Sequence, residues 1–170
     1  MEPLKLLFVS LLLITLSCSK EDSGMRLSEF ETPVVTGFEL RDIQGIVRGY
    51  IGTPNVKLGN ESNHFDSEYY FVTYPNPCRE SCVVYGQTPD SNETKYVWIV
   101  QAQYIDNSTN STTNIVNAVL LGSGGAPLIQ SEFSSNNILL DLSGLSPGYY
   151  RIYLKVADVI LYDNLIVTNN

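Results

Sequence analysis

The chain has 170 residues and a formal net charge of −8, and only 16% of its residues are charged. This acidity argues against a nucleic-acid partner, because phosphates require a basic face, and against electrostatic docking on anionic lipid. Abundant Tyr, Thr, Ser, Asn and Val favour strands and turns over helices.

The first 17 residues are typical of a cleaved export signal. Lys5 precedes an apolar-to-small run from Leu6 to Leu16, which is shorter than the helix of about 20 residues that spans a bilayer. An ordinary secretory signal or a short uncleaved anchor would share these features. Thr15-Leu16-Ser17-Cys18, however, resembles a bacterial lipobox, whose Cys receives diacylglycerol. We therefore expect a signal peptide over 1–17 and a lipidated Cys18.

Residues 19–33 are polar and without periodicity, which predicts a lipidated flexible tether over 18–33. Cys18-Ser19-Lys20-Glu21-Asp22 resembles the surface-export signal of Bacteroidetes lipoproteins, in which Lys and acidic residues follow the lipidated Cys. The resemblance implies an outer-membrane lipoprotein displayed on the cell surface. One acyl chain holds a protein only marginally, whereas two or three make a stable anchor.

The remaining chain, 34–168, predicts an all-β domain. Its first strand pair is expected at Val35–Arg41 and Ile46–Ile51, joined by a short loop with Gly45 placed late. Short apolar runs between turn residues, with no amphipathic helix, indicate a sandwich or barrel. Further strands are expected at Glu68–Thr73, Glu80–Tyr85, Lys95–Ile105, Ile115–Leu121, Pro127–Phe133 and Ile138–Leu142.

The last two expected strands carry the clearest pattern. Between Tyr150 and Val156 apolar residues alternate with Arg, Tyr and Lys, and Val159–Val167 follows as the hairpin partner. A slip of one residue would bury both charges, so the register is firmly set. Pro147-Gly148 before them suits a type II turn, which would give Gly148 a positive φ.

Two stretches of the second half resemble a known module. Tyr74-Pro75-Asn76-Pro77 opens this region, and Ile138–Tyr150, with Asp-Leu-Ser-Gly-Leu and Pro-Gly-Tyr, lies near its apolar end. In this order they resemble the C-terminal sorting domain of type IX secretion cargo, an immunoglobulin-like β-sandwich of Bacteroidetes. The resemblance covers about residues 69–167 and implies a single immunoglobulin-like sandwich. We carry over the fold and not the sorting function, because Asp163-Asn164 replaces the basic residues usual near the final strand.

Two cysteines remain besides Cys18. Cys78 and Cys82 are spaced C-x3-C in what we expect to be an oxidising compartment, where disulfides persist. With His64 as the only histidine, they make an incomplete set for zinc. We favour a Cys78–Cys82 disulfide over two free thiols, provided that the geometry allows it.

Catalysis has few candidate residues in this chain. A nucleophile–His–acid site would need His64 as its base. His64, Asp66 and Glu68 would share one face of a strand and could ligate a divalent metal, but the polar run before them predicts a loop. We expect no catalytic residue, no metal and no cofactor.

The aromatic residues are the remaining candidates. Apolar neighbours on both sides place Trp98 in the core, with a sugar-stacking platform as the alternative. The sequence thus predicts a membrane-anchored, non-catalytic module that binds a protein or glycan or acts structurally. The alternative is a small cell-envelope hydrolase or metal-dependent enzyme that uses the His64 region. Tyrosines, amphipathic in character, are the candidates for surface contacts: Tyr69, Tyr70, Tyr149, Tyr150 and Tyr153.

Overall fold

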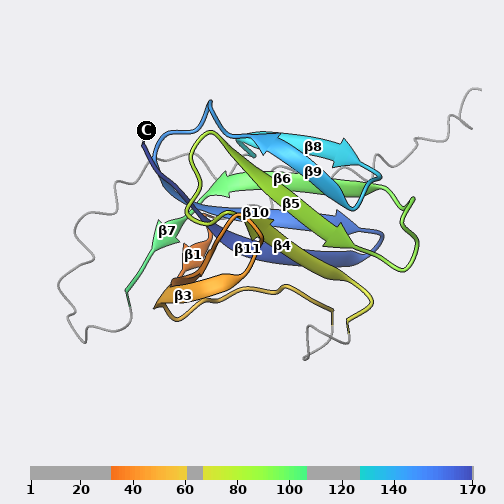
Figure 1. The fold of residues 1–170 in the computed structure, drawn as a ribbon, viewed down its shortest axis with the longest axis horizontal. Helices are drawn as coiled ribbons and strands as arrows, with labels where there is room; N and C mark the ends of the chain where they lie inside the picture. The colour runs from red at the N-terminus through yellow and green to blue at the C-terminus, as the bar shows by residue number, and fades with distance from the viewer. Residues whose placement is uncertain (1–31, 61–66, 107–126, 170) are drawn as a thin grey trace, which may run out of the picture.

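The computed structural model describes residues 32–60, 67–106 and 127–169, which are all-β and contain no helix (Figure 1). The predicted all-β, sandwich-like fold is confirmed. The strands are β1 Val34–Val35, β2 Gly37–Arg41, β3 Val47–Gly52, β4 Tyr70–Tyr74, β5 Ser81–Gln87, β6 Lys95–Gln101, β7 Gln103–Tyr104, β8 Ile129–Phe133, β9 Asn137–Asp141, β10 Gly148–Val156 and β11 Val159–Val167.

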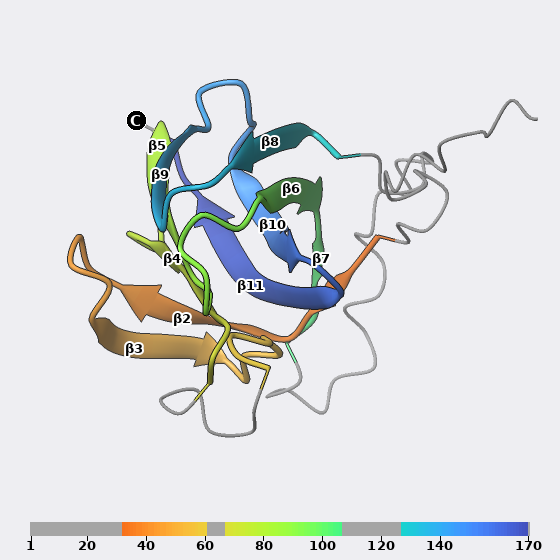
Figure 2. The same ribbon diagram turned by 90° about the vertical axis from the view of Figure 1, so that its right-hand side faces the viewer.

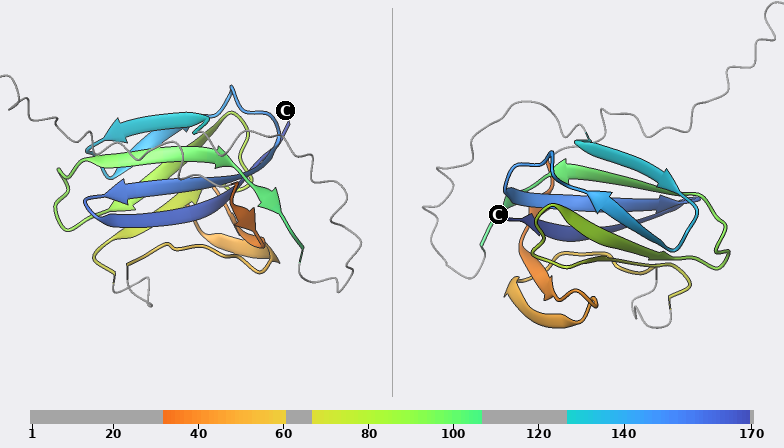
Figure 3. Two further views of the ribbon diagram at one scale, coloured as in Figure 1. Left: turned by 180° about the vertical axis from the view of Figure 1, so that it is seen from behind. Right: turned by 45° about the horizontal axis from the view of Figure 1, so that its top comes forward.

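Two sheets form the sandwich. One has the strand order β11-β10-β6-β8, seen from its outer side in Figure 3, and the other has the order β4-β5-β9. Figure 2 shows the two layers nearly end on. Fully buried side chains from both layers meet between them, Phe71 and Val84 from one sheet and Ile99 and Leu154 from the other. The apolar periodicity of the strands therefore builds one main core.

The closing hairpin has the predicted register. β10 and β11 pair without a break from Gly148↔Val167 to Val156↔Val159, and the alternate apolar residues of β10 point into the main core. The predicted type II turn is wrong in one respect. Gly148 is not among the described residues with positive φ and starts β10 as an extended residue.

The expected first strand is divided in two. β1 pairs in parallel with β7, and β2 pairs with β3 in a separate hairpin that lies against β11 (Figure 2). Gly52 ends β3 with φ +61°, and a Cβ there would lie 2.3 Å from the Thr36 carbonyl oxygen. Only glycine fits this close approach.

Two other expected elements differ from the structure or lie beyond it. The expected strand Lys95–Ile105 is interrupted at Ala102, where the chain passes from β6 to β7. Ala102 packs with Val35 and Phe38 in a second, smaller core under the β2–β3 hairpin. The expected strand Ile115–Leu121 lies outside the described residues.

Candidate functional site

The predicted site residues are only partly covered by the structure. Cys18, the expected signal peptide, most of the expected tether and His64 lie outside the described residues. Within the described ranges, no three or more His, Cys, Asp or Glu side chains come together in a way that could hold a metal ion. No helix of that part of the chain is long and apolar enough to cross a membrane.

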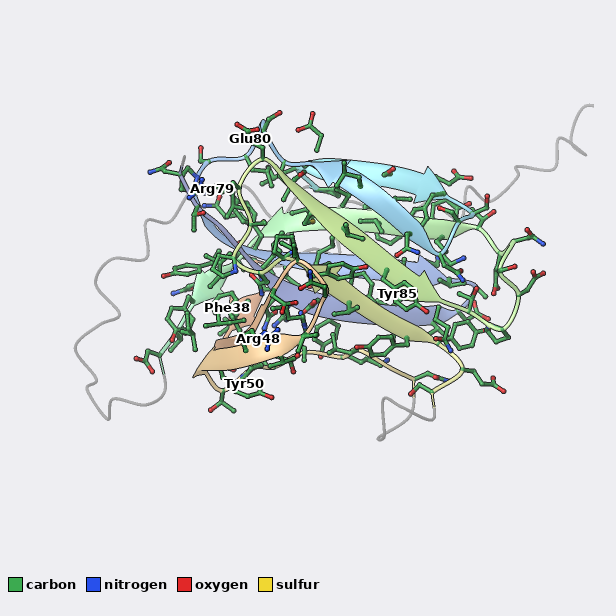
Figure 4. The ribbon with its side chains drawn as sticks, viewed as in Figure 1. Phe38, Arg48, Tyr50, Arg79, Glu80 and Tyr85 are labelled. Carbon is green, nitrogen blue, oxygen red and sulfur yellow. The ribbon has the colours of Figure 1, made fainter. Side chains whose placement is uncertain are left out.

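Exposed apolar side chains gather on the β2–β3 hairpin. Ile43 is 72% exposed, Tyr50 64% and Ile46 51%, and Val47 and Ile51 are also exposed. These five residues, here named the hairpin surface, are five of the twelve exposed large hydrophobic residues in the described part of the chain. Figure 4 shows Tyr50 on β3 at the lower rim of the molecule. Tyr50 and Ile51 are consecutive on β3 and point to opposite faces, so these apolar groups are distributed around the hairpin rather than on one face. Exposed apolar groups concentrated on one element are typical of an interaction site.

β3 is an edge strand. Among the described residues it pairs only with β2, so its outer edge leaves backbone groups unpaired. The β2–β3 register shifts at Leu40/Arg41, and Arg48 lies at this irregularity. A bulge and a charged side chain are two ways in which proteins prevent uncontrolled strand addition. The hairpin therefore presents exposed side chains together with an open edge, and the bulge and Arg48 interrupt that edge near its start.

The tip of the hairpin is held by Asp42. Its Oδ1 accepts the N–H groups of Gln44 and Ile46, each at 3.0 Å, and Oδ2 lies 2.7 Å from Arg48 Nε. Desolvation is the largest single influence and raises the pKa of Asp42, but the hydrogen bonds and the Arg48 charge together outweigh it and lower the pKa. Gly45, at φ +79°, supplies the left-handed residue of the turn. This turn fixes the spacing between the exposed Ile43 and Ile46.

The base of the hairpin is fixed by an aromatic cluster. Phe38 is fully buried, with its ring centroid 5.3 Å from that of Tyr149 and 5.4 Å from that of Tyr104. Tyr149, a surface candidate by sequence, thus supports the hairpin although it is partly exposed. Tyr150 is buried in the main core, so it is not a surface residue.

A buried ion pair joins the hairpin to the sandwich. Arg41 Nη1 lies 2.7 Å from Asp163 Oδ2, and Arg41 Nη2 lies 2.5 Å from Glu39. Thr73 donates to the same Asp163 oxygen from its N–H and its hydroxyl. Burial disfavours the Arg41 charge, but Asp163 and Glu39 outweigh it and raise the pKa of Arg41. Asp163 therefore connects β2, β4 and β11.

A second polar cluster adjoins this pair. The Asn76 amide donates to the Glu39 and Asn164 carbonyls, and its Oδ1 accepts the Ile166 N–H. Asn164 accepts from Arg151 Nε and donates to the Gly37 carbonyl. Arg151 faces away from the main core, as predicted, yet these contacts bury it. Asp163-Asn164 thus ties the first strands to the last.

Trp98 lies on the face of its sheet that is turned away from the main core. It is only 4% exposed, but it pairs across from Tyr153, which faces away from the main core, and it belongs to neither core cluster. Its ring stacks on Tyr96 with centroids 6.2 Å apart. The predicted burial is confirmed: Trp98 is one of the buried hydrophobic residues, although it packs outside the two core clusters.

The two described cysteines form an adjacent pair of thiols. Both are free and buried, at 2% and 1% exposure for Cys78 and Cys82, and both belong to the main core cluster. The Cys78 thiol donates to the Ile166 carbonyl at 3.4 Å, and each thiol shifts the pKa of the other. A hollow of about 460 Å³ opens beside them, lined by Pro75, Pro77, Cys78, Arg79, Glu80 and Ser81. Figure 4 shows Arg79 and Glu80 at this upper end of the molecule. The predicted disulfide stays a prediction, and the geometry brings its two members together.

No protein-family model matches the chain, and no curated protein matches its sequence. The functional argument therefore depends on the geometry of the described residues. The hairpin surface is the main feature that was not predicted from the sequence. Its signal was present in the sequence, because the expected strand Ile46–Ile51 carries apolar side chains on both of its faces.

Proposed function

We propose that this protein is a membrane-anchored bacterial lipoprotein that acts as a non-catalytic binding module. Lipid on Cys18 holds it at the outer membrane, and the hairpin surface binds a protein or glycan. The observation that carries the proposal is the concentration of exposed apolar side chains on the β2–β3 hairpin. Tyr50 adds a polar hydroxyl to an apolar ring, a combination that suits either partner.

The rigidity of the hairpin supports a binding role. Asp42 fixes its turn, Phe38 fixes its base, and Arg41 joins it to the sandwich. A surface that is already in its bound shape loses less conformational entropy when a partner arrives. The hairpin surface is therefore suited to binding without rearrangement.

The tether supports the proposed location. Residues 18–33 separate the lipidated Cys from β1, and an extended chain of that length reaches roughly 50 Å. This reach lets the hairpin surface contact partners beyond the membrane surface. The lipobox-like Thr15–Cys18 and the following Ser-Lys-Glu-Asp are the basis for outer-membrane display.

Site-specific photo-crosslinking in intact cells tests the binding role. A photoreactive phenylalanine analogue replaces Tyr50 in one variant and Leu139 in a matched variant. Leu139 is 71% exposed and lies on β9, away from the hairpin. We expect a discrete crosslinked species from position 50 and none from position 139. Absence of a species from position 50, or the same species from both positions, would refute binding through the hairpin.

A further inference from the structure

Cys78 and Cys82 lie at a junction between the two sheets. The Cys78 N–H donates to the Ile166 carbonyl and the Cys78 carbonyl accepts the Thr168 N–H, each at 2.9 Å. These bonds attach Cys78 to the end of β11. Cys82 belongs to β5 in the other sheet, where it pairs with Leu140 of β9. The backbone thus holds each cysteine independently while their side chains meet.

The two thiols have different surroundings. Cys78 lines the hollow beside Pro75 and Arg79, whereas Cys82 does not line it. Both cysteines belong to the main core at nearly equal exposure, so the position of Cys78 in the lining of the hollow is what distinguishes the two. An incoming reagent therefore meets Cys78 first.

We propose that Cys78 and Cys82 are a dithiol–disulfide couple, in which Cys78 exchanges with an incoming disulfide and Cys82 resolves the mixed disulfide. This inference is independent of the proposed binding role. Its substrate class is a protein or small-molecule disulfide that reaches the hollow next to Arg79 and Glu80.

The acidity of the two thiols agrees with this assignment. The hydrogen bond from Cys82 lowers the pKa of Cys78, and it outweighs the opposing effect of burial. The same hydrogen bond, together with burial, raises the pKa of Cys82. Because the thiolate is the attacking species, Cys78 is the nucleophile of the pair.

The reaction is a balanced thiol–disulfide exchange. The Cys78 thiolate attacks one sulfur of the incoming disulfide, which forms a mixed disulfide and releases the first thiolate. The Cys82 thiol then loses its proton and attacks Cys78 Sγ, which forms the Cys78–Cys82 bond and releases the second thiolate. The two protons end on the released thiols, so the protein is oxidised and the incoming disulfide is reduced.

Closure of this bond has a structural consequence. It joins a residue attached to β11 to a residue of β5, so the two sheets become covalently linked at one end of the sandwich. It also closes Arg79, Glu80 and Ser81, which line the hollow, into a small ring. The oxidised protein therefore has a more rigid rim at this hollow than the reduced protein.

The test uses the reduced, purified full-length protein with oxidised glutathione as the probe. Peptide mapping by mass spectrometry follows the segment that contains both cysteines, which keeps Cys18 out of the readout. We expect wild type to lose both alkylatable thiols by forming the internal disulfide. We expect Cys82→Ser to accumulate glutathione on Cys78 at least about tenfold faster than Cys78→Ser accumulates it on Cys82.

Two outcomes would overturn the proposal. Wild-type thiols that stay fully alkylatable after prolonged exposure to oxidised glutathione would show that there is no couple. Equal or reversed glutathionylation rates in the two Ser variants would show that the roles are wrongly assigned. Should either variant fail to fold, native wild type treated briefly with iodoacetamide answers the same question. Label found first on Cys78 supports the assignment, and label found first on Cys82 contradicts it.

Discussion

Replacing Arg41 by methionine tests whether the buried ion pair holds the hairpin on the sandwich. Asp163 is fully buried, and its Oδ2 accepts hydrogen bonds from Arg41 at 2.7 Å and from Thr73 at 3.0 and 2.8 Å. Arg41→Met leaves this carboxylate buried without its ion-pair partner. Breaking a buried pair from one side costs about 3–5 kcal/mol. For a domain of this size, roughly 3 °C per kcal/mol, the melting temperature should fall by about 9–15 °C.

Urea unfolding measures the change in the free energy of unfolding. The fluorescence of Trp98, the single tryptophan, follows the transition. Arg48→Met is the matched control, because Arg48 also pairs with an aspartate, Asp42, but its side chain is 64% exposed. We expect the control to leave stability nearly unchanged, as exposed pairs contribute little. A loss below about 1 kcal/mol for Arg41→Met, or equal losses in the two variants, would refute the reasoning.

Three further predictions concern the anchor, the outer face and the turn. Cys18→Ala should move the protein from the membrane to the soluble fraction in cell fractionation; retention in the membrane would count heavily against the anchor. Trp98→Ala should lower the free energy of unfolding by about 3–5 kcal/mol, the range for large buried aromatics, and an unchanged denaturation curve would show that it is not a packing residue. The pKa of Asp42 is lowered from its ordinary value of 3.8. The stabilisation from its hydrogen bonds is therefore fully present at pH values above 3.8 and is lost as the pH falls through the lower pKa of the folded state. After correction for intrinsic exchange rates, the Gln44 and Ile46 amides of wild type should therefore lose protection against hydrogen exchange at acid pH. In Asp42→Ala the same amides should be unprotected at every pH. Protection that does not depend on Asp42 would contradict this.

The closing hairpin could be predicted from the sequence because its determinants are local. Alternation from Tyr150 to Val156 places each side chain on one face, and the two charges forbid a slip of one residue. β11 has the predicted bounds, β10 begins two residues earlier than predicted, at Gly148, and the two strands pair as predicted. The interruption at Ala102 could not be predicted in this way, because it depends on packing with Val35 and Phe38 from the distant first strands.

The contacts that position the candidate site lie far apart in the sequence. Arg41 and Asp163 are separated by 122 positions, so no local sequence pattern predicts their pairing. By sequence, Asp163-Asn164 was only a departure from the sorting-domain resemblance, whereas in the structure both residues are buried and hydrogen-bonded to the first strands.

Trp98 illustrates a different limit of sequence reasoning. Apolar neighbours on both sides predicted its burial, which the structure confirms. The same pattern could not tell which face of β6 lies against the other sheet, because Val97 and Ile99 alternate with Trp98 and Val100 and all four are apolar. The pairing of β6 with β10 determines which face of β6 lies against the other sheet.

Mass spectrometry of the N-terminal peptide of the native, membrane-extracted protein tests the central claim most directly. Membrane anchorage predicts a mature chain that begins at Cys18 and carries diacylglycerol on its thiol, with residues 1–17 removed. An N-terminus at another residue without lipid would contradict it.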